Sequence, residues 1–559
     1  MLWQWLFAFY YFIKYLPLRL WRHRGPMEHR GFIGVQVDGL SHADLMHALE
    51  RGYLSRLRRQ LRTHEFNLLR YPAGLPSSTP YAQAGIFYGE NSNIPGFRWY
   101  ERGDRRVVNC NRPHSVDYLQ GRLGSHLGVL RGGSSYVNLI DGGADRAVLT
   151  ANSSVPRSFF EEIGGFRAFL LALLHPVRVA RTLLAALLEV FFELYDRYVS
   201  RRGKRDTVTE GWFPLVRALS NVIFREVQTV AVMADIYAGV PYIYTTYAGY
   251  DELAHHHGPR SRPALNDLRG IFRRVAEIER IARRLGGRHY DVIILSDHGQ
   301  TEGTPFLKLF GATLGEAMHR HLEGHRVRVE ANPRELPQAA TRDLYAEHLH
   351  RRAEKRSFLV RRFLRRVARS LRKITSIETY LPEKYYVDED SDVVVTYSGT
   401  LAHVYFSRWG ERLDDDAVRR EFGGLLDFLV GHPGIGLVAT RAAGGGLILR
   451  SGAGVARLAE GKLEVLEGGN PLAPYGDVPE ARRALERFGA FTNVGDLVLF
   501  GAYDGQRIVC FDDHVASHGC LGGPQFWPFL LVPNDPRFDR LAIADPRDLY
   551  YQVFLPYHQ

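Results

Sequence analysis

The sequence predicts an α/β fold in which a doubly wound, mostly parallel sheet is flanked by helices and interrupted by a helical insertion and an inserted cap. Three short apolar runs, rich in β-branched residues, each end just before Asp, His or Ser side chains, as buried parallel strands do. Stretches of helical periodicity, such as residues 215–238, lie between the runs. The alternation of strand and helix predicts the fold class.

The three expected strands occupy residues 31–38, 241–247 and 292–295. In open α/β sheets, ligands bind beyond the carboxyl ends of the strands. Acids and histidines that follow these strands are therefore candidate site residues.

The chain has 559 residues, which is long enough for more than one folded unit. Two long segments interrupt the alternation, one with a helical stripe and one with glycine-rich turns and short β-like runs. The expected division is a membrane-associating segment at 1–25, a catalytic core at 31–305 with a helical insertion at 157–205, a cap at 306–510 that includes a basic helix at 350–373, and a return to the core at 511–559.

Composition excludes several classes of protein. Hydrophobic residues make up 45% and charged residues 24% of the chain, which is typical of a folded globular protein. Only Cys110, Cys510 and Cys520 are cysteines, and no CxxC pair occurs, so neither a thiolate zinc site nor a disulfide scaffold is expected. A metal ion would have to use Asp, Glu and His.

The net charge of +11 is concentrated in one segment. Residues 351–373 contain eleven Lys or Arg residues and a single acid, Glu354, interleaved with apolar residues at helical spacing. This pattern predicts a basic amphipathic helix, which suits an anionic membrane surface and is equally typical of a solvated helix packed on the domain. No nucleic-acid-binding motif accompanies it, so no specific nucleic-acid binding is expected.

The N-terminal segment adds to the case for a membrane. Residues 2–13 are apolar apart from Gln4, and basic residues follow from Lys14. A helix of this length reaches about 20 Å, short of the ~30 Å hydrocarbon core, and its charge polarity is opposite to that of a secretory signal. We expect an uncleaved anchor, with the cytoplasmic side favoured by the basic residues and the periplasmic or extracytoplasmic side left open.

Five short motifs follow one another along the chain. They are VDGLS at Asp38, LPSSTP at Thr79, DELAHHHGP at Asp251 to Pro259, LSDHG at Asp297 and His298, and ASHGCLGGP at His518. In this order they resemble the alkaline phosphatase superfamily and, within it, the type I phosphodiesterase and nucleotide pyrophosphatase family. The resemblance covers residues 31–305 and 398–535 and implies an alkaline phosphatase-like fold.

The resemblance implies two divalent metal ions, zinc by preference, with manganese and other divalent ions also accepted. By matched motif, one ion would be held by Asp251, His255 and His518, and the other by Asp38, Asp297 and His298 together with the Thr79 hydroxyl. His256 and His257 are more typical of supporting or surface residues. His514 competes with His518, which is preferred because Ser-His-Gly fits the late motif of the family.

The resemblance also implies that the Thr79 hydroxyl attacks phosphorus. Relatives place the attacking residue about ten positions before a glycine, and counting back from Gly89 reaches Thr79. Pro80 follows at once, where relatives have a spacer, so Ser78 stays an alternative. The hydroxyl cluster also fits an N-cap that opens a helix. Asn91 and Asn93 could donate to a phosphoryl oxygen or only shape a turn.

The implied function is metal-dependent hydrolysis of phosphate esters, most simply by a phosphodiesterase or nucleotide pyrophosphatase with a phosphothreonine intermediate. Transfer of a phosphoryl head group at a membrane, or phosphomonoesterase activity, would use the same groups. Sulfatase activity is disfavoured because no CxPxR-like context surrounds Thr79. An inactive membrane scaffold would not need so many convergent Asp and His residues.

Overall fold

The computed structural model describes residues 29–150, 225–322, 325–329 and 392–559, except residues 149, 286, 287, 320 and 326. Three expected segments lie outside the described residues: the N-terminal segment 1–25, the helical insertion 157–205 and the basic helix 350–373. Within the described part of the chain, no helix combines the length and apolar character needed to cross a membrane.

The main sheet has seven strands. They are β1 (Gly31–Val37), β2 (Phe66–Arg70), β5 (Ser134–Tyr136), β6 (Arg146–Val148), β7 (Tyr242–Tyr247), β8 (Tyr290–Leu295) and β20 (Phe529–Pro533). Their order is β2-β20-β8-β1-β7-β5-β6, and β1 at the centre pairs in parallel with both β7 and β8. Only β20 runs against its neighbours, so the predicted mostly parallel sheet is confirmed.

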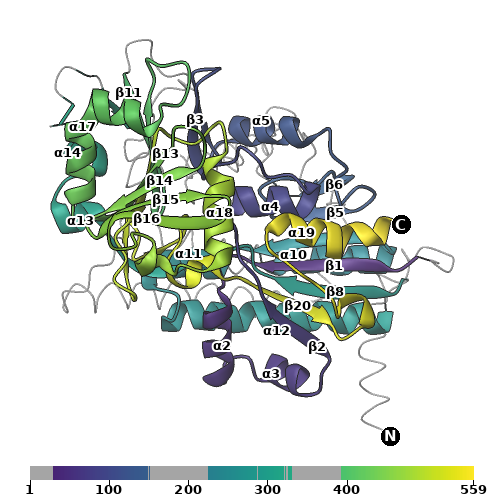
Figure 1. The fold of residues 1–559 in the computed structure, drawn as a ribbon. Coiled ribbons are helices and arrows are strands. Elements are labelled where there is room, and N and C mark those ends of the chain that lie inside the picture. Colours follow the sequence, from purple (N-terminus) through teal and green to yellow (C-terminus); the bar gives the residue numbers. More distant parts are fainter. Residues whose placement is uncertain are drawn as a thin grey trace, which may run out of the picture.

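Helices cover both faces of this sheet, as a doubly wound fold requires (Figure 1). Side chains alternate along β1: Ile33, Val35 and Val37 belong to one hydrophobic cluster, and Phe32 belongs to the other. The first cluster includes α2 (His42–Glu50), α3 (Ser55–Arg62), α10 (Arg225–Ala238), α11 (Gly249–His257) and α12 (Arg262–Leu285). The second includes α4 (Thr79–Tyr88), α5 (Pro113–Leu123) and α19 (Pro546–Leu549).

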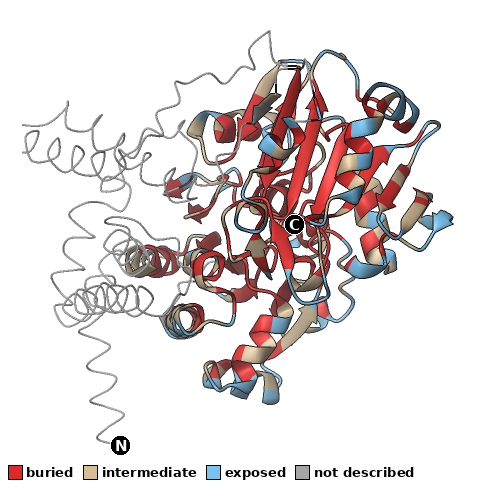
Figure 2. Ribbon diagram, turned by 90° about the vertical axis from the view of Figure 1, so that its left-hand side faces the viewer, coloured by how far each residue is buried: buried red, intermediate tan, exposed pale blue. Residues whose placement is uncertain are grey.

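A second, eight-stranded sheet lies beside the first (Figure 1). Its strands are β10 (Val327–Val329), β11 (Val393–Ser398), β12 (Leu401–Phe406), β13 (Ile435–Arg441), β14 (Leu447–Ser451), β15 (Gly454–Ala459), β16 (Lys462–Gly468) and β17 (Leu497–Gly501). Apolar residues of α17 (Asp415–Gly431) and of α18 (Pro479–Gly489) pack in different clusters of this sheet. Figure 2 shows that the strands of both sheets are largely buried.

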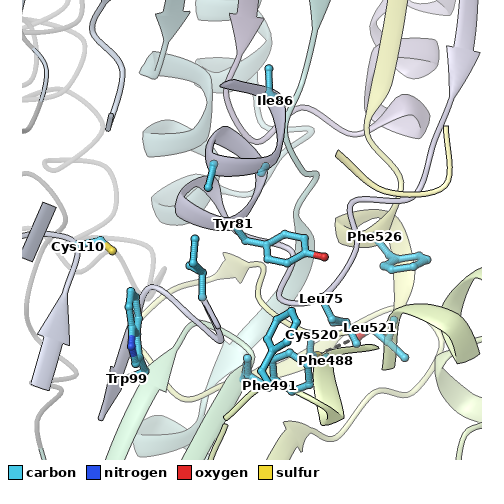
Figure 3. Close-up of a cluster of buried hydrophobic side chains, with 14 of the residues drawn as sticks. Leu75, Tyr81, Ile86, Trp99, Cys110, Phe488, Phe491, Cys520, Leu521 and Phe526 are labelled. Carbon is cyan, nitrogen blue, oxygen red and sulfur yellow. Dashed lines mark hydrogen bonds between the residues drawn. The ribbon is translucent and has the colours of Figure 1, made fainter. Parts of the chain in front are cut away.

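One hydrophobic cluster joins the two sheets. Tyr81 of α4 lies near Phe488 and Phe491, which come from the α18 region, and Trp99 of the β3 (Arg98–Glu101) and β4 (Arg106–Asn109) hairpin belongs to the same cluster (Figure 3). The ring centroids of Tyr81 and Phe491 are 6.4 Å apart. The helix that begins at Thr79 therefore shares its hydrophobic cluster with α18 and with residues of the second sheet.

A small three-stranded sheet links distant parts of the chain. Its strands are β9 (Thr301–Pro305), β18 (Ile508–Cys510) and β19 (Ala516–Ser517), in the order β18-β9-β19. Ser517 pairs with Thr301 in antiparallel register. This pairing brings the late His518 beside the segment that follows β8.

Candidate metal centre

The candidate residues lie where the central strands end. Asp38 follows β1 directly, Asp297 and His298 follow β8, and α11, which carries Asp251 and His255, follows β7. Because β1, β7 and β8 are parallel neighbours, their carboxyl ends meet at one edge of the sheet.

Asp251, His255 and His518 form the first group, and one ligand atom from each lies within 4.8 Å of the others. On α11, His255 Nε2 lies 3.2 Å from Asp251 Oδ2, one helical turn away. The Nδ1 atoms of His255 and His518 donate to the carbonyl oxygens of Ala516 and Ser77, each at 2.8 Å. These bonds set both rings so that Nε2 is the nitrogen available to a ligand.

Asp38, Asp297 and His298 form the second group by the same distance. His298 Nε2 lies 3.4 Å from Asp297 Oδ2 and 3.7 Å from Asp38 Oδ1. His298 Nδ1 donates to the Gly299 carbonyl oxygen at 3.0 Å, so Nε2 again faces the carboxylates.

The two groups adjoin each other. The rings of His298 and His518 are stacked with centroids 3.7 Å apart. Gly39 lies between the groups with a φ of 67°, and a Cβ there would approach Asp251 Oδ1 to 2.0 Å. Only glycine fits this close approach of backbone to carboxylate, which gives the Asp-Gly pair of the VDGLS motif a physical reason.

The buried carboxylates of the site favour the binding of positive charge. Burial, together with the neighbouring Asp297 and Asp251 carboxylates, raises the pKa of Asp38 well above its usual value. Burial alone would lower the pKa of His255, but the Asp251 carboxylate outweighs it and raises this pKa to about 9. In the absence of metal ions, bound protons therefore supply the positive charge that the site favours.

The residues present fit two divalent ions. Asp297 Oδ2 is buried and, beyond the 3.4 Å approach of His298 Nε2, finds no hydrogen-bond partner among the described residues, which is costly for a carboxylate oxygen unless a ligand completes it. Three carboxylates and three imidazoles, with no thiolate, form the donor set. Such donors suit zinc and also manganese.

Thr79 faces the second group. Its Oγ1 lies 3.2 Å from His298 Nε2 and donates to Asp38 Oδ1 at 3.4 Å. Thr79 is the first residue of α4, which ends at Gly89 in the left-handed conformation with a φ of 66°. Ser78, the alternative attacking residue, is only 1% exposed, and its hydroxyl has no hydrogen-bond partner in the part of the chain that the structure describes. The spacing from Gly89 thus leads to the hydroxyl that faces the cluster.

The other histidines of the two motifs have different surroundings. His514 is buried and packs against the His255 ring at a centroid distance of 4.3 Å, but it belongs to neither group of potential ligands. His256 Nε2 lies 3.2 Å from Glu252 Oε1, away from the Asp251 pair. Among the late histidines, His518 is the one that joins a group.

Asn91 and Asn93 lie beyond the opposite end of α4. Asn91 donates to Asp545 Oδ1 at 3.2 Å and accepts from Arg487 at 2.6 Å. Asn93 Oδ1 accepts from the Thr492 backbone at 2.7 Å. Their contacts are those of structural residues that fix a loop, rather than of donors to a phosphoryl group.

Sequence reasoning missed Gln300, which follows the SDHG motif directly. Gln300 is fully buried, and its Nε2 donates to Asp251 Oδ1 at 2.5 Å and to the Asp251 carbonyl oxygen at 2.9 Å. Gln300 thus follows the second group in sequence, while its side chain holds the Asp251 carboxylate of the first group. A polar residue immediately after a recognised motif was the available signal.

The sequence and the structure were compared with known proteins. Residues 33–391 match the family described as type I phosphodiesterase / nucleotide pyrophosphatase. This match contains Thr79 and all the predicted metal ligands except His518, which lies beyond its end together with the competing His514. No curated protein matches the chain.

Several solved structures are similar to the chain at low identity. Phosphonoacetate hydrolase from Sinorhizobium meliloti 1021, in complex with phosphonoformate, is 14% identical with a TM-score of 0.43, over 95% of this chain and 96% of that chain. Murine ectonucleotide pyrophosphatase / phosphodiesterase 5 is 10% identical with a TM-score of 0.44, over 94% and 95%. Wild-type alkaline phosphatase PafA is 13% identical with a TM-score of 0.43, over 90% and 91%.

Proposed function

This chain belongs to the type I phosphodiesterase / nucleotide pyrophosphatase family, and from that premise we propose that it hydrolyses phosphate diesters by attack of the Thr79 hydroxyl on phosphorus. It is a hydrolase that acts on phosphoric ester bonds. The observation that carries the finer proposal is the place of Thr79 Oγ1, 3.2 Å from His298 Nε2 at the start of α4.

The start of α4 favours a phosphoryl group. The first backbone N–H groups of a helix have no partner within the helix and carry partial positive charge. A phosphoryl group bonded to Thr79 Oγ1 would lie at this end, where negative charge is stabilised. Ser78 is the N-cap residue of the helix, but its side chain is buried and makes no capping bond, so it is the weaker candidate.

In this proposal, the two groups of Asp and His residues would hold two divalent ions, and Thr79 Oγ1 would be a further ligand at the second group. When bound, the ions supply Lewis-acid chemistry: they lower the pKa of the attacking oxygens and neutralise charge that develops on the leaving oxygen. The hydrogen bonds from His255 and His518 Nδ1 to backbone carbonyls hold both rings in place for this role.

The reaction divides into two displacements. In the first, a bond forms between Thr79 Oγ1 and phosphorus and the bond from phosphorus to the leaving oxygen breaks. The Thr79 proton passes to solvent, and the leaving oxygen takes a proton from solvent to become the free alcohol. In the second, a water oxygen bonds to phosphorus, Thr79 Oγ1 leaves and regains a proton, and a phosphate monoester is released. Each displacement would be in line. The covalent intermediate divides one difficult reaction into two easier steps.

A substrate panel tests the proposal. Bis-p-nitrophenyl phosphate, p-nitrophenyl phosphate, nucleotide diesters and lipid head-group esters should be compared with protein supplied with zinc or manganese. We expect faster turnover of diesters than of monoesters, and loss of turnover in chelator. Metal analysis should find about two divalent ions per chain.

The same panel separates the alternatives. Preference for the monoester would identify a phosphomonoesterase and contradict the diester proposal. Appearance of a new ester when an alcohol acceptor is added would identify a head-group transferase. Full activity in chelator would overturn the metal-dependent mechanism altogether.

We further propose that the protein binds anionic membrane surfaces. The support is the sequence of two segments, the apolar residues 2–13 and the basic residues 351–373, which lie outside the described residues. An apolar segment together with a basic segment would provide two signals, which stable membrane association generally needs.

A further inference from the structure

Two hydrogen bonds link α4 to β1 and to Asp38, the residue directly after this strand. Thr79 Oγ1 donates to Asp38 Oδ1 at 3.4 Å, and one helical turn further on, Gln83 Nε2 donates to Gln36 Oε1 at 3.3 Å. Gln36 lies two residues before Asp38, and therefore on the same face of the strand. The Gln83–Gln36 contact therefore lies one helical turn beyond the Thr79–Asp38 contact, further from the end of β1.

The spacings of helix and strand agree. Four residues of α-helix advance about 6 Å, and two residues of β-strand advance about 6.6 Å. Thr79 and Gln83 share one face of α4, so both contacts form at once without bending either element. The Gln83–Gln36 contact therefore sets how far α4 lies along β1, and with it the position of Thr79 over Asp38.

Gln83 is bonded at both ends of its amide. Its Oε1 accepts from the backbone N–H of Leu139 at 2.8 Å, and its Nε2 also contacts Thr246 Oγ1 at 3.4 Å. Thr246 pairs with Gln36 in the register of β7 and β1. The amide thus connects α4 to two central strands and to the segment after β5.

The burial of this amide pair needs an explanation. Gln83 and Gln36 are both 0% exposed, and the rest of α4 from Pro80 to Tyr88 is also buried, mostly with apolar side chains. An apolar side chain of similar size would fill the same space without having to satisfy an amide. Directional bonds, unlike apolar contacts, fix the position of a helix along a strand.

We propose that Gln83 is a positioning residue for the reaction, and that its bond to Gln36 holds the Thr79 hydroxyl in line beside the second group of metal ligands. This inference rests on the proposed function, because it takes Thr79 as the attacking residue. Gln83 touches neither substrate nor metal and acts only through α4.

The test compares Gln83→Met with a matched control on the same helix. Methionine keeps the length and unbranched shape of glutamine but removes the amide. We expect kcat for bis-p-nitrophenyl phosphate to fall about 10- to 100-fold, because a small misplacement of an attacking atom has an effect of this size, while KM and the metal content stay unchanged. Tyr88→Phe removes the 3.0 Å bond from Tyr88 to Asp141 at the far end of α4 and should leave kcat within about twofold.

A double-mutant cycle separates positioning from general damage. In a Thr79→Ala background, Gln83→Met should cause no further loss, because there is no attacking oxygen left to misplace. Gln36→Met provides the same test from the strand side if Gln83→Met does not fold. An equal loss in both backgrounds, or an unchanged kcat in both glutamine variants, would overturn the inference. Near-normal turnover of Thr79→Ala itself would instead overturn the proposed function.

Discussion

His255 Nε2 lies 3.2 Å from Asp251 Oδ2, so an imidazole and a carboxylate four residues apart face each other across one turn of α11. Burial opposes a charged ring, yet the carboxylate raises the pKa of His255 to about 9. At neutral pH the metal-free protein therefore carries a proton on the nitrogen that a cation would need.

This relationship predicts that metal affinity rises with pH. An ion must displace the proton from His255, so below a pKa of about 9 this group alone should change the affinity about tenfold per pH unit. Affinity should be lowest in acid, where the ring is most fully protonated. Calorimetric titration with zinc or manganese, in buffers that differ in ionisation enthalpy, would measure the protons released.

Two variants provide the control. His255→Gln should lose one of the two ions together with its proton release. His256→Gln changes the next histidine of the same helix, which contacts Glu252 instead, and should keep both ions. Affinity that does not change with pH on either side of neutral would contradict the assignment of His255.

A second prediction concerns the attacking hydroxyl. Thr79→Ala should keep its metal ions through the remaining ligands but lose about three orders of magnitude or more in turnover, because the covalent step is lost. Ser78→Ala should cost little, since that hydroxyl is buried and makes no hydrogen bond to the described residues. Thr79→Ser should retain part of the activity, with looser control of the hydroxyl rotamer. Phosphate found on Ser78 after acid quenching would contradict the assignment.

Much of this site could be predicted from local sequence. Asp38, Asp297 and His298 follow buried strands, and parallel neighbouring strands deliver such residues to one edge of a sheet. Asp251 and His255 are four residues apart, so a helix is enough to place them on one face, and both lie on α11. These features depend on contacts close in sequence, or on one rule of sheet topology.

Other features depend on contacts between distant segments. For these, the local sequence either predicted the residue without its contacts, as the Ser-His-Gly motif did for His518, or gave no pattern. His518 reaches the site because Ser517 pairs with Thr301, and an antiparallel pairing over such a separation is not encoded in either segment alone. Gln83 is a polar residue in an apolar helix, and its role could not be predicted because its partner, Gln36, lies on a distant strand. The structural role of Asn91 depends on its hydrogen bond to Asp545, which comes from the end of the chain.

A third prediction concerns membranes. The intact protein should sediment with vesicles that contain anionic lipid, and high salt should release part of it, since exposed charges are screened. Deletion of residues 1–24 should release more, because apolar insertion does not respond to salt. Replacement of the arginines of residues 351–373 by glutamine should remove the salt-sensitive part alone. Full solubility of the intact chain at low salt, with vesicles present, would contradict the proposal.

Arg487 of α18 anchors the loop beyond the helix that carries Thr79. It donates to Asp545 Oδ2 at 3.1 Å and to Asn91 Oδ1 at 2.6 Å, and it also contacts the Tyr81 hydroxyl. Burial would raise the pKa of Asp545, but Arg487, the Tyr81 hydroxyl and Arg547 hold it below its usual value. A carboxylate with a lowered pKa stabilises the fold above about pH 4, where the unfolded group is ionised, and loses this effect as the pH falls.

Arg487→Met should therefore lower the free energy of unfolding by about 2 kcal/mol at neutral pH, because a largely buried carboxylate loses its principal cation. The variant should also lose less stability than the wild type between neutral pH and about pH 3, since the lowered pKa is what makes stability fall in acid. Urea unfolding at several pH values measures both effects. Arg483→Met is the matched control. Arg483 is one turn earlier on α18, is 58% exposed and forms an exposed ion pair with Glu480 at 3.5 Å, so its loss should change stability by less than about 0.5 kcal/mol. Equal effects of the two substitutions would show that Arg487 does not stabilise the buried carboxylate.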